Sequence, residues 1–185
     1  MSRRQFLRQG GVGLLAFTVG GCTQEMTPQE ARRRGAALQV LSETEVAGLE
    51  RLGETLLPGS AERGLAQYID HQLAANPEDS MLMIKYLGVP RPFAPFYSGG
   101  LAAASVAAMQ LYDTELAKLT DEQSNALAGR IASGELDDWQ GPPSPFFYFV
   151  LRADAVDVVY GGERGFADLG IPYAAHIAPP SRWGE

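Results

Sequence analysis

The stretch SPFFYFVLRADAVDVVY, residues 144–160, decides the fold because it is too apolar for an ordinary surface helix. Ser144 is a favourable N-cap and Pro145 suits the first helical position, so the pattern predicts the start of a long helix. A helix that is apolar on most of its faces needs burial. We therefore expect residues 144–160 either to form the centre of the core or to pack against a partner protein.

Helical signals also cover most of the chain upstream of this stretch. Two capping boxes, Ser42 with Glu45 and Thr120 with Gln123, pair a hydroxyl with a longer polar side chain three residues later and predict helix starts. Apolar residues follow each of them at helical spacing. These signals predict helices before residue 144 over residues 42–57, 62–75, 79–88, 99–117 and 120–133.

Residues 88–100 (GVPRPFAPFYSGG) contain three prolines and three aromatic residues. We expect an extended loop there, because proline disfavours helical backbone in the residue before it. The side chains of Phe93, Phe96 and Tyr97 would either form an exposed adhesive patch or pack onto the domain's own core. Residues 135–143 are a second expected loop. No run of residues alternates with period two over a convincing length, so the predicted fold class is all-α. We expect a single compact helical domain of about five to six helices, with long loops rich in proline and glycine, after an N-terminal signal segment.

The beginning of the chain has the layout of an export signal. Its charged opening, with Arg3, Arg4, Phe6 and Leu7, resembles the twin-arginine motif that directs folded proteins to export. The uncharged stretch over residues 10–21 is about 12 residues long, whereas a membrane-spanning helix needs about 20. We expect twin-arginine export to the periplasm; the alternative is a basic, frayed N-terminal arm.

The only cysteine of the chain, Cys22, stands where this apolar stretch ends. Val19-Gly20-Gly21-Cys22 resembles a lipobox, in which a small residue precedes the cysteine that receives diacylglycerol. We expect lipidation and membrane association at this position; the alternative is an ordinary unpaired small apolar residue. The expected division is a signal peptide over residues 1–21, a tether over 22–41 and a helical domain over 42–185.

The inventory of reactive residues excludes most metal and redox chemistry. The chain has one cysteine and two histidines, whereas zinc sites, iron–sulfur clusters and c-type haem attachment need several such ligands. The formal net charge of −7 would become more negative after signal removal, because the leader carries three arginines and no acid. A nucleic-acid-binding protein needs clustered basic residues, so nucleic acid is an unsuitable partner. We expect no cofactor on this chain.

The remaining polar residues do not form a catalytic constellation. Asp137-Asp138 is interpreted as a solvated acidic turn, His71 as a surface histidine on a helix, and His176 has no evident partner. The glycine run GGERG, residues 161–165, follows a predicted helix rather than a strand. It is therefore expected to be a helix end with glycine at positive φ, and not a phosphate-binding loop. No catalytic, cofactor-binding or metal-ligating residue is predicted.

The same glycine run carries a family resemblance. The ending Pro145-Phe146-Phe147, Val159-Tyr160-Gly161-Gly162 and Gly170-Ile171-Pro172, behind a twin-arginine signal, resembles the gluconate 2-dehydrogenase subunit 3 family. Its members are small subunits of membrane-associated, FAD-dependent sugar dehydrogenases of the glucose–methanol–choline (GMC) type. The resemblance covers roughly residues 41–175 and includes Tyr68-Ile69-Asp70. One departure is Glu163, which stands where the family pattern has asparagine.

The resemblance implies a division of labour between chains. In that family the large subunit holds FAD and oxidises the sugar, and a multihaem cytochrome c often takes the electrons to the membrane. The small subunit has no cofactor, assists maturation of the large subunit, and its signal exports the folded pair through the twin-arginine translocase. This chain would then be a non-catalytic subunit held at the membrane by Cys22 or by the complex.

Two other readings stay open: a free-standing periplasmic lipoprotein that acts as a binding or scaffold module, and an autonomous enzyme. If the chain is a subunit, its exposed aromatic residues and the glycine turn would contact the large chain. The expected interface residues are Phe93, Phe96, Tyr97, Phe146, Phe147, Tyr160, Gly161, Gly162, Arg164 and Pro172.

Overall fold

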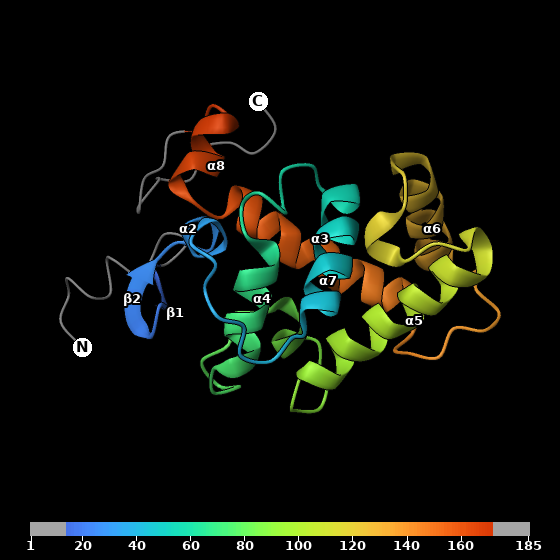
Figure 1. The fold of residues 1–185 in the computed structure, drawn as a ribbon, viewed down its shortest axis with the longest axis horizontal. Coiled ribbons are helices and arrows are strands. Elements are labelled where there is room, and N and C mark those ends of the chain that lie inside the picture. Colours follow the sequence, from blue (N-terminus) through green and yellow to red (C-terminus); the bar gives the residue numbers. More distant parts are fainter. Residues whose placement is uncertain (1–13, 172–185) are drawn as a thin grey trace, which may run out of the picture.

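Helix α7, Ser144–Tyr160, runs across the molecule behind α3 (Glu43–Leu56) and α5 (Ala94–Tyr112) as seen in Figure 1, in a computed structural model that describes residues 14–171. It contacts these two helices and three others: α4 (Leu65–Ala74), α6 (Asp121–Ser133) and α8 (Glu163–Asp168). Its inward residues, including Phe147, Val150 and Leu151, are buried. Of the two predicted alternatives, burial in the core is therefore confirmed for this face of the helix. The helix starts one residue earlier than predicted, with Pro143 as the N-cap and Ser144 inside the helix.

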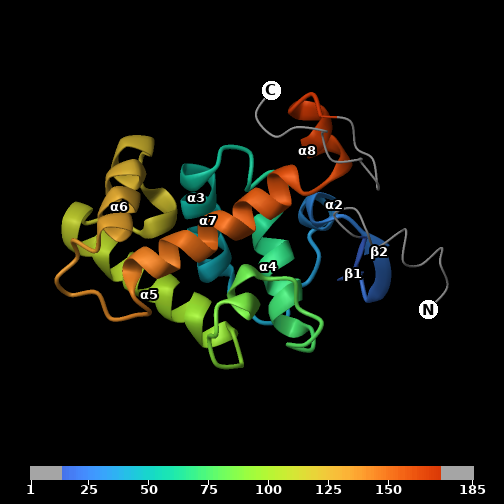
Figure 2. The same ribbon diagram turned by 180° about the vertical axis from the view of Figure 1, so that it is seen from behind.

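The predicted all-α class is also confirmed, with one small sheet in addition. Helices cover most of the described residues and form a single compact domain (Figures 1 and 2). In chain order the other elements are β1 Leu15–Val19, β2 Cys22–Met26, α2 Pro28–Arg33, α3 Glu43–Leu56, α4 Leu65–Ala74, the 3₁₀ turn η1 Met83–Tyr86, α5 Ala94–Tyr112, the 3₁₀ turn η2 Leu116–Lys118, α6 Asp121–Ser133 and α8 Glu163–Asp168.

Both predicted capping boxes are present. At the start of α3, the Ser42 hydroxyl accepts a hydrogen bond from the Glu45 N–H at 3.3 Å, and the Glu45 carboxylate accepts one from the Ser42 N–H at 2.8 Å. Thr120 and Gln123 make the equivalent pair at the start of α6. Gly134, with φ 79°, ends α6. These boundaries depend on local chemistry alone, which is why the sequence predicts them well.

The predicted helix over residues 79–88 is wrong, since only the single 3₁₀ turn η1 forms there. Side chains from other elements accept hydrogen bonds from backbone N–H groups of this segment, and that of Met83 is one that the predicted helix would use internally. Gln72 accepts from the N–H of Met81 at 2.8 Å, and Asp154 accepts from the N–H of Met83 at 3.0 Å. Tertiary hydrogen bonds therefore replace the helical ones in this segment.

The expected loop over residues 88–100 is half wrong, because α5 already begins at Ala94. Pro95 occupies the second helical position, where its missing N–H costs no intrahelical hydrogen bond. The helix ends at Tyr112, earlier than the predicted residue 117, and η2 follows. Proline in the first turn thus marks a helix start here and not an extended segment.

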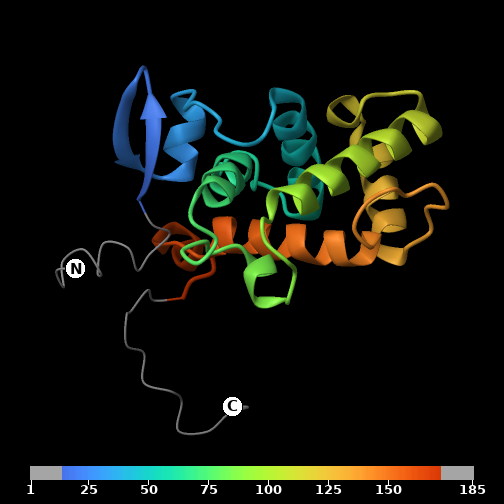
Figure 3. The ribbon, with the colours of Figure 1, turned by 90° about the horizontal axis from the view of Figure 1, so that it is seen from below.

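The segment predicted as the end of the signal and the start of a tether folds as a hairpin and a short helix. Strands β1 and β2 pair antiparallel across a two-residue turn, in which Gly20 and Gly21 both have positive φ. Such Gly-Gly turns suit the twist of a hairpin. The hairpin and α2 lie at one end of the molecule, away from α6 (Figure 3). Within residues 14–171, no helix combines the length and the apolarity that a membrane crossing requires.

Candidate subunit-interaction site

The aromatic residues predicted to line an interface are largely part of the core. Phe93, Phe96, Tyr97 and Phe147 are all buried. The Phe96 ring lies 5.5 Å from that of Tyr97 and 5.9 Å from that of Phe147, centroid to centroid. Of the two alternatives for Phe93, Phe96 and Tyr97, packing onto the domain's own core therefore holds, and Phe147 is buried in the same core. Phe146 is only partly buried.

Helix α7 presents a different apolar face to solvent. Phe149 is 50% exposed and Val156 is 40% exposed, and Tyr160 is half-buried. Spacings of seven and four residues place these three side chains on one side of the helix, opposite Phe147. Figure 2 shows α7 crossing the near side of the molecule. The central helix is thus buried on one face and available for contact on the other.

The glycine turn comes directly after this helix face in the chain. Gly161 caps α7 with φ −70°, and Gly162 is the N-cap of α8, so neither glycine supplies the predicted positive φ. The reason for glycine is clearer at Gly165, where an added Cβ would lie 2.4 Å from the Tyr160 Cα and 2.5 Å from the Val159 carbonyl oxygen. Helix α8 therefore folds back tightly onto the end of α7.

An ion pair holds α8 to the rest of the domain. The guanidinium of Arg63, in the segment before α4, lies 2.6 Å from the Asp168 carboxylate. Exposed apolar side chains continue beyond this point at Leu169 and Ile171. We call Phe149, Val156, Tyr160 and the turn of Gly161, Gly162 and Arg164 the α7–α8 surface. Of the other predicted interface residues, Pro172 lies outside the described residues.

Asp154 is the most unusual ionisable group of the core. It is fully buried on α7, where its carboxylate accepts hydrogen bonds from the Tyr97 hydroxyl at 2.6 Å and from the Met83 N–H at 3.0 Å. Burial raises its pKa from the usual 3.8 to about 7, against the opposing effect of these two hydrogen bonds. Burial also raises the pKa of Tyr97 and of neighbouring Tyr68. The two hydrogen bonds of Asp154 join α7 to α5 and η1.

The raised pKa of Asp154 predicts a pH-dependent stability difference. The folded carboxyl binds its proton more tightly than the unfolded one, so the fold loses stability as pH rises from about 4 to about 7. Asp154→Asn removes this loss. We expect the free energy of unfolding of the variant, minus that of the wild type, to increase by about 2 kcal/mol between about pH 5.5 and about pH 7.5.

Urea denaturation at the two pH values measures this difference. The increase should be absent in the matched exposed variant Asp138→Asn. If the free energies of unfolding of wild type and Asp154→Asn differ by the same amount at both pH values, Asp154 titrates like an ordinary carboxyl.

Asp70, from the Tyr68-Ile69-Asp70 motif, has a structural role that its sequence position alone does not reveal. It is buried on α4 and accepts three backbone hydrogen bonds, from the N–H groups of Gln39, Val40 and Leu41, at 2.9, 2.9 and 2.8 Å. These bonds fasten the segment before the Ser42 capping box to α4. A single side chain thereby fixes the start of the domain.

The other polar groups singled out in the sequence do not assemble into a reactive cluster. Asp137 and Asp138 are exposed at the rim of an open pocket of about 180 Å³, in agreement with a solvated turn. His71 is not the predicted surface residue; it packs beneath the hairpin, its ring 5.1 Å from that of Phe17. Residues 14–171 contain no group of acidic, histidine or cysteine side chains placed to hold a metal ion. His176 lies outside the described residues.

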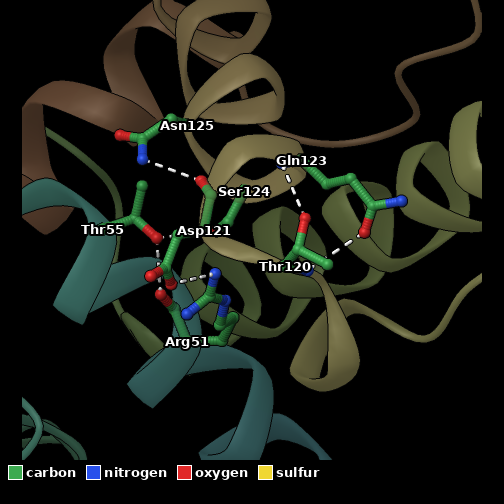
Figure 4. A network of polar contacts seen from close by, with 7 residues as sticks. All are labelled: Arg51, Thr55, Thr120, Asp121, Gln123, Ser124 and Asn125. Carbon is green, nitrogen blue, oxygen red and sulfur yellow. Dashed lines mark hydrogen bonds and ion pairs between the residues drawn. The ribbon is translucent and has the colours of Figure 1, made fainter.

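The polar network between α3 and α6 is likewise structural. Thr55 and Ser124 share a hydrogen bond at 2.6 Å, and the Arg51 guanidinium lies 2.9 Å from the Asp121 carboxylate (Figure 4). These contacts join the two capped helices. They pair one hydroxyl with another and a guanidinium with a carboxylate, so neither contact is a nucleophile–base pair. Among the residues proposed for export, Arg3, Arg4, Phe6 and Leu7 lie outside the described part of the chain. Cys22 is an exposed free cysteine at the start of β2.

The described part of the chain is therefore a helical domain that exposes an apolar face of α7 with an adjoining glycine turn. It belongs to the gluconate 2-dehydrogenase subunit 3 family, whose model matches residues 43–176. The match begins at the first residue of α3 and extends past α8. No curated protein and no solved structure matches the chain. The family name implies association with other subunits of a dehydrogenase complex.

Proposed function

We propose that this chain is the non-catalytic small subunit of an exported, FAD-dependent sugar or alcohol dehydrogenase complex. In this proposal it aids maturation of the flavin-containing large subunit, of the GMC type, and its twin-arginine signal carries the folded pair to the periplasm. FAD belongs to the large subunit, and a multihaem cytochrome c is a further candidate partner. The observation that carries the proposal is the family match over residues 43–176.

Two features of the fold support an accessory role. The two buried carboxylates of residues 14–171, Asp70 and Asp154, both accept hydrogen bonds from groups of their own domain. Exposed apolar side chains occur on several elements, and two of them, Phe149 and Val156, lie on one side of α7 next to the glycine turn. An apolar helix face with polar surroundings suits a protein partner. We place the large subunit on the α7–α8 surface.

A charge placed on this surface should weaken the complex. Val156→Asp would bury an unpaired carboxylate against the partner, and we expect at least a tenfold loss of association with the large subunit, or about 1.4 kcal/mol. The control is Val106→Asp on α5, which makes the same change at a valine that is 50% exposed. Co-purification with a tagged chain measures both. Equal association of the two variants would place the interface elsewhere.

The shared-signal idea has its own test. With Arg3→Lys and Arg4→Lys together, both this chain and the large subunit should stay in the cytoplasm, because the twin-arginine pair is the address that the translocase reads. Fractionation of cells that express both chains measures the distribution. Export of the large subunit at the normal level in this variant would contradict co-export.

The second candidate is a free-standing periplasmic lipoprotein, with which the exposed Cys22 is compatible. Lipidation of Cys22 and location at the membrane belong to both candidates, so they do not separate them. Association with a flavoprotein separates the two candidates, because a lipoprotein acting alone would purify without one. A Cys22→Ser variant that leaves the membrane fraction would support anchoring by lipid.

A further inference from the structure

The strand β1 occupies part of the stretch that the sequence marks as the apolar half of an export leader, residues 1–21. In the folded chain this strand alternates, with Ala16 and Thr18 exposed and Phe17 only 3% exposed. The same residues therefore have two uses: one in the folded domain and one, under the proposed function, in export.

The side chain of Phe17 packs into a small apolar cluster. Its ring is buried with Met26 of β2 and Ala31 of α2, and Ala36 packs against the same cluster. On the far side it contacts the ring of His71 on α4, at 5.1 Å between centroids. We call Met26, Ala31, Ala36 and His71 the leader seat.

Backbone hydrogen bonds add to the apolar contacts. The N–H of Ala37 donates to the Thr18 carbonyl oxygen at 2.9 Å. Strand β1 is thus held on one edge by β2 and on the other by the segment after α2. Three of the four seat residues, Met26, Ala31 and Ala36, lie before the residues matched by the family model, which begin at position 43.

We propose that the unprocessed chain holds the apolar half of its leader in this seat, and so restrains its own export until the hairpin detaches. The proposal rests on the proposed export function. A leader engaged in the seat cannot also be engaged by the translocase, and apparent affinity falls with the fraction of chains in which the leader is free. Cleavage before Cys22 would divide the hairpin at its turn and empty the seat permanently.

The first test asks whether the leader is seated. In full-length chain with Cys22→Ser, a thiol introduced by Ala31→Cys should react with a maleimide at least tenfold more slowly than one introduced by Arg33→Cys, which is exposed on the same helix. Phe17→Asp should expose the Ala31→Cys thiol, whereas Thr18→Asp, the same charge on the exposed face of β1, should leave it protected. Equal reactivity of the two thiols in the unaltered leader would overturn the proposal.

The second test asks whether the seat restrains export, and it changes the seat without changing the leader. Ala31→Glu should increase the rate of export in a pulse-chase experiment at least twofold. Ala47→Glu, the same substitution at an exposed helical alanine, should leave that rate unchanged. An Ala31→Glu chain exported at the wild-type rate would overturn the restraint. Export of Ala31→Glu with Arg3→Lys and Arg4→Lys would instead overturn the twin-arginine route, so the two failures are distinguishable.

Discussion

Replacing Gly100 with alanine should destabilise the fold by about 3 kcal/mol, because the crossing of α5 and α7 leaves no room for a side chain there. A Cβ at Gly100 would lie 2.3 Å from two carbons of the Phe147 ring. That ring is buried and lies against the rings of Phe96 and Trp139, so it cannot move aside without disturbing the core. Equilibrium denaturation in urea gives the free energy of unfolding.

The neighbouring residue supplies the control. An added Cβ at Gly99 would meet only Pro142, at an ordinary contact distance of 3.6 Å. Because alanine is favoured over glycine within a helix, Gly99→Ala should stabilise the fold by about 0.5–1 kcal/mol. Two variants with equal stability would mean that α5 and α7 do not cross as closely as described.

Replacing Asp70 with alanine should cost about 3 kcal/mol, because three backbone N–H groups lose their acceptor together. Asp70→Asn should cost less but still destabilise: one oxygen can serve Val40 and Leu41, while the amide N–H₂ would face the N–H of Gln39. Denaturation in urea ranks the two variants against wild type.

The control for this prediction is Asp138→Ala, at an exposed position, which should change stability by less than about 0.5 kcal/mol. An Asp70→Ala chain as stable as Asp138→Ala would mean that the segment before Ser42 is held by other contacts. It would also remove the structural explanation for the Tyr68-Ile69-Asp70 motif.

The parts of the fold that the sequence predicted are those set by local chemistry. A capping box is made by residues three apart, so Ser42 with Glu45 and Thr120 with Gln123 identify their helices without knowledge of the rest. The central place of residues 144–160 follows from apolarity alone. The hairpin was missed because the alternation in β1 is only five residues long.

The candidate site was harder to predict. The elements packed around an apolar helix decide which of its sides faces solvent. Phe147 and Phe149 look alike in the sequence, yet α5 covers the first and leaves the second half exposed. Phe93, Phe96 and Tyr97 follow prolines that suggested a loop, but they lie at the start of α5 and point into the core. The tertiary partners of Asp70 and Asp154 are 29 or more residues away along the chain, beyond any local pattern.

Twin-arginine export, lipidation at Cys22 and the flavin-containing partner remain predictions, and they converge on one question: whether this chain acts through another. The direct measurement is purification from its own cells through a C-terminal tag, followed by a flavin absorbance spectrum and a sugar-oxidation assay before and after the chains are separated. We predict that flavin and activity accompany a larger second chain and are absent from this chain alone. Flavin or sugar oxidation retained by the isolated chain would contradict the account.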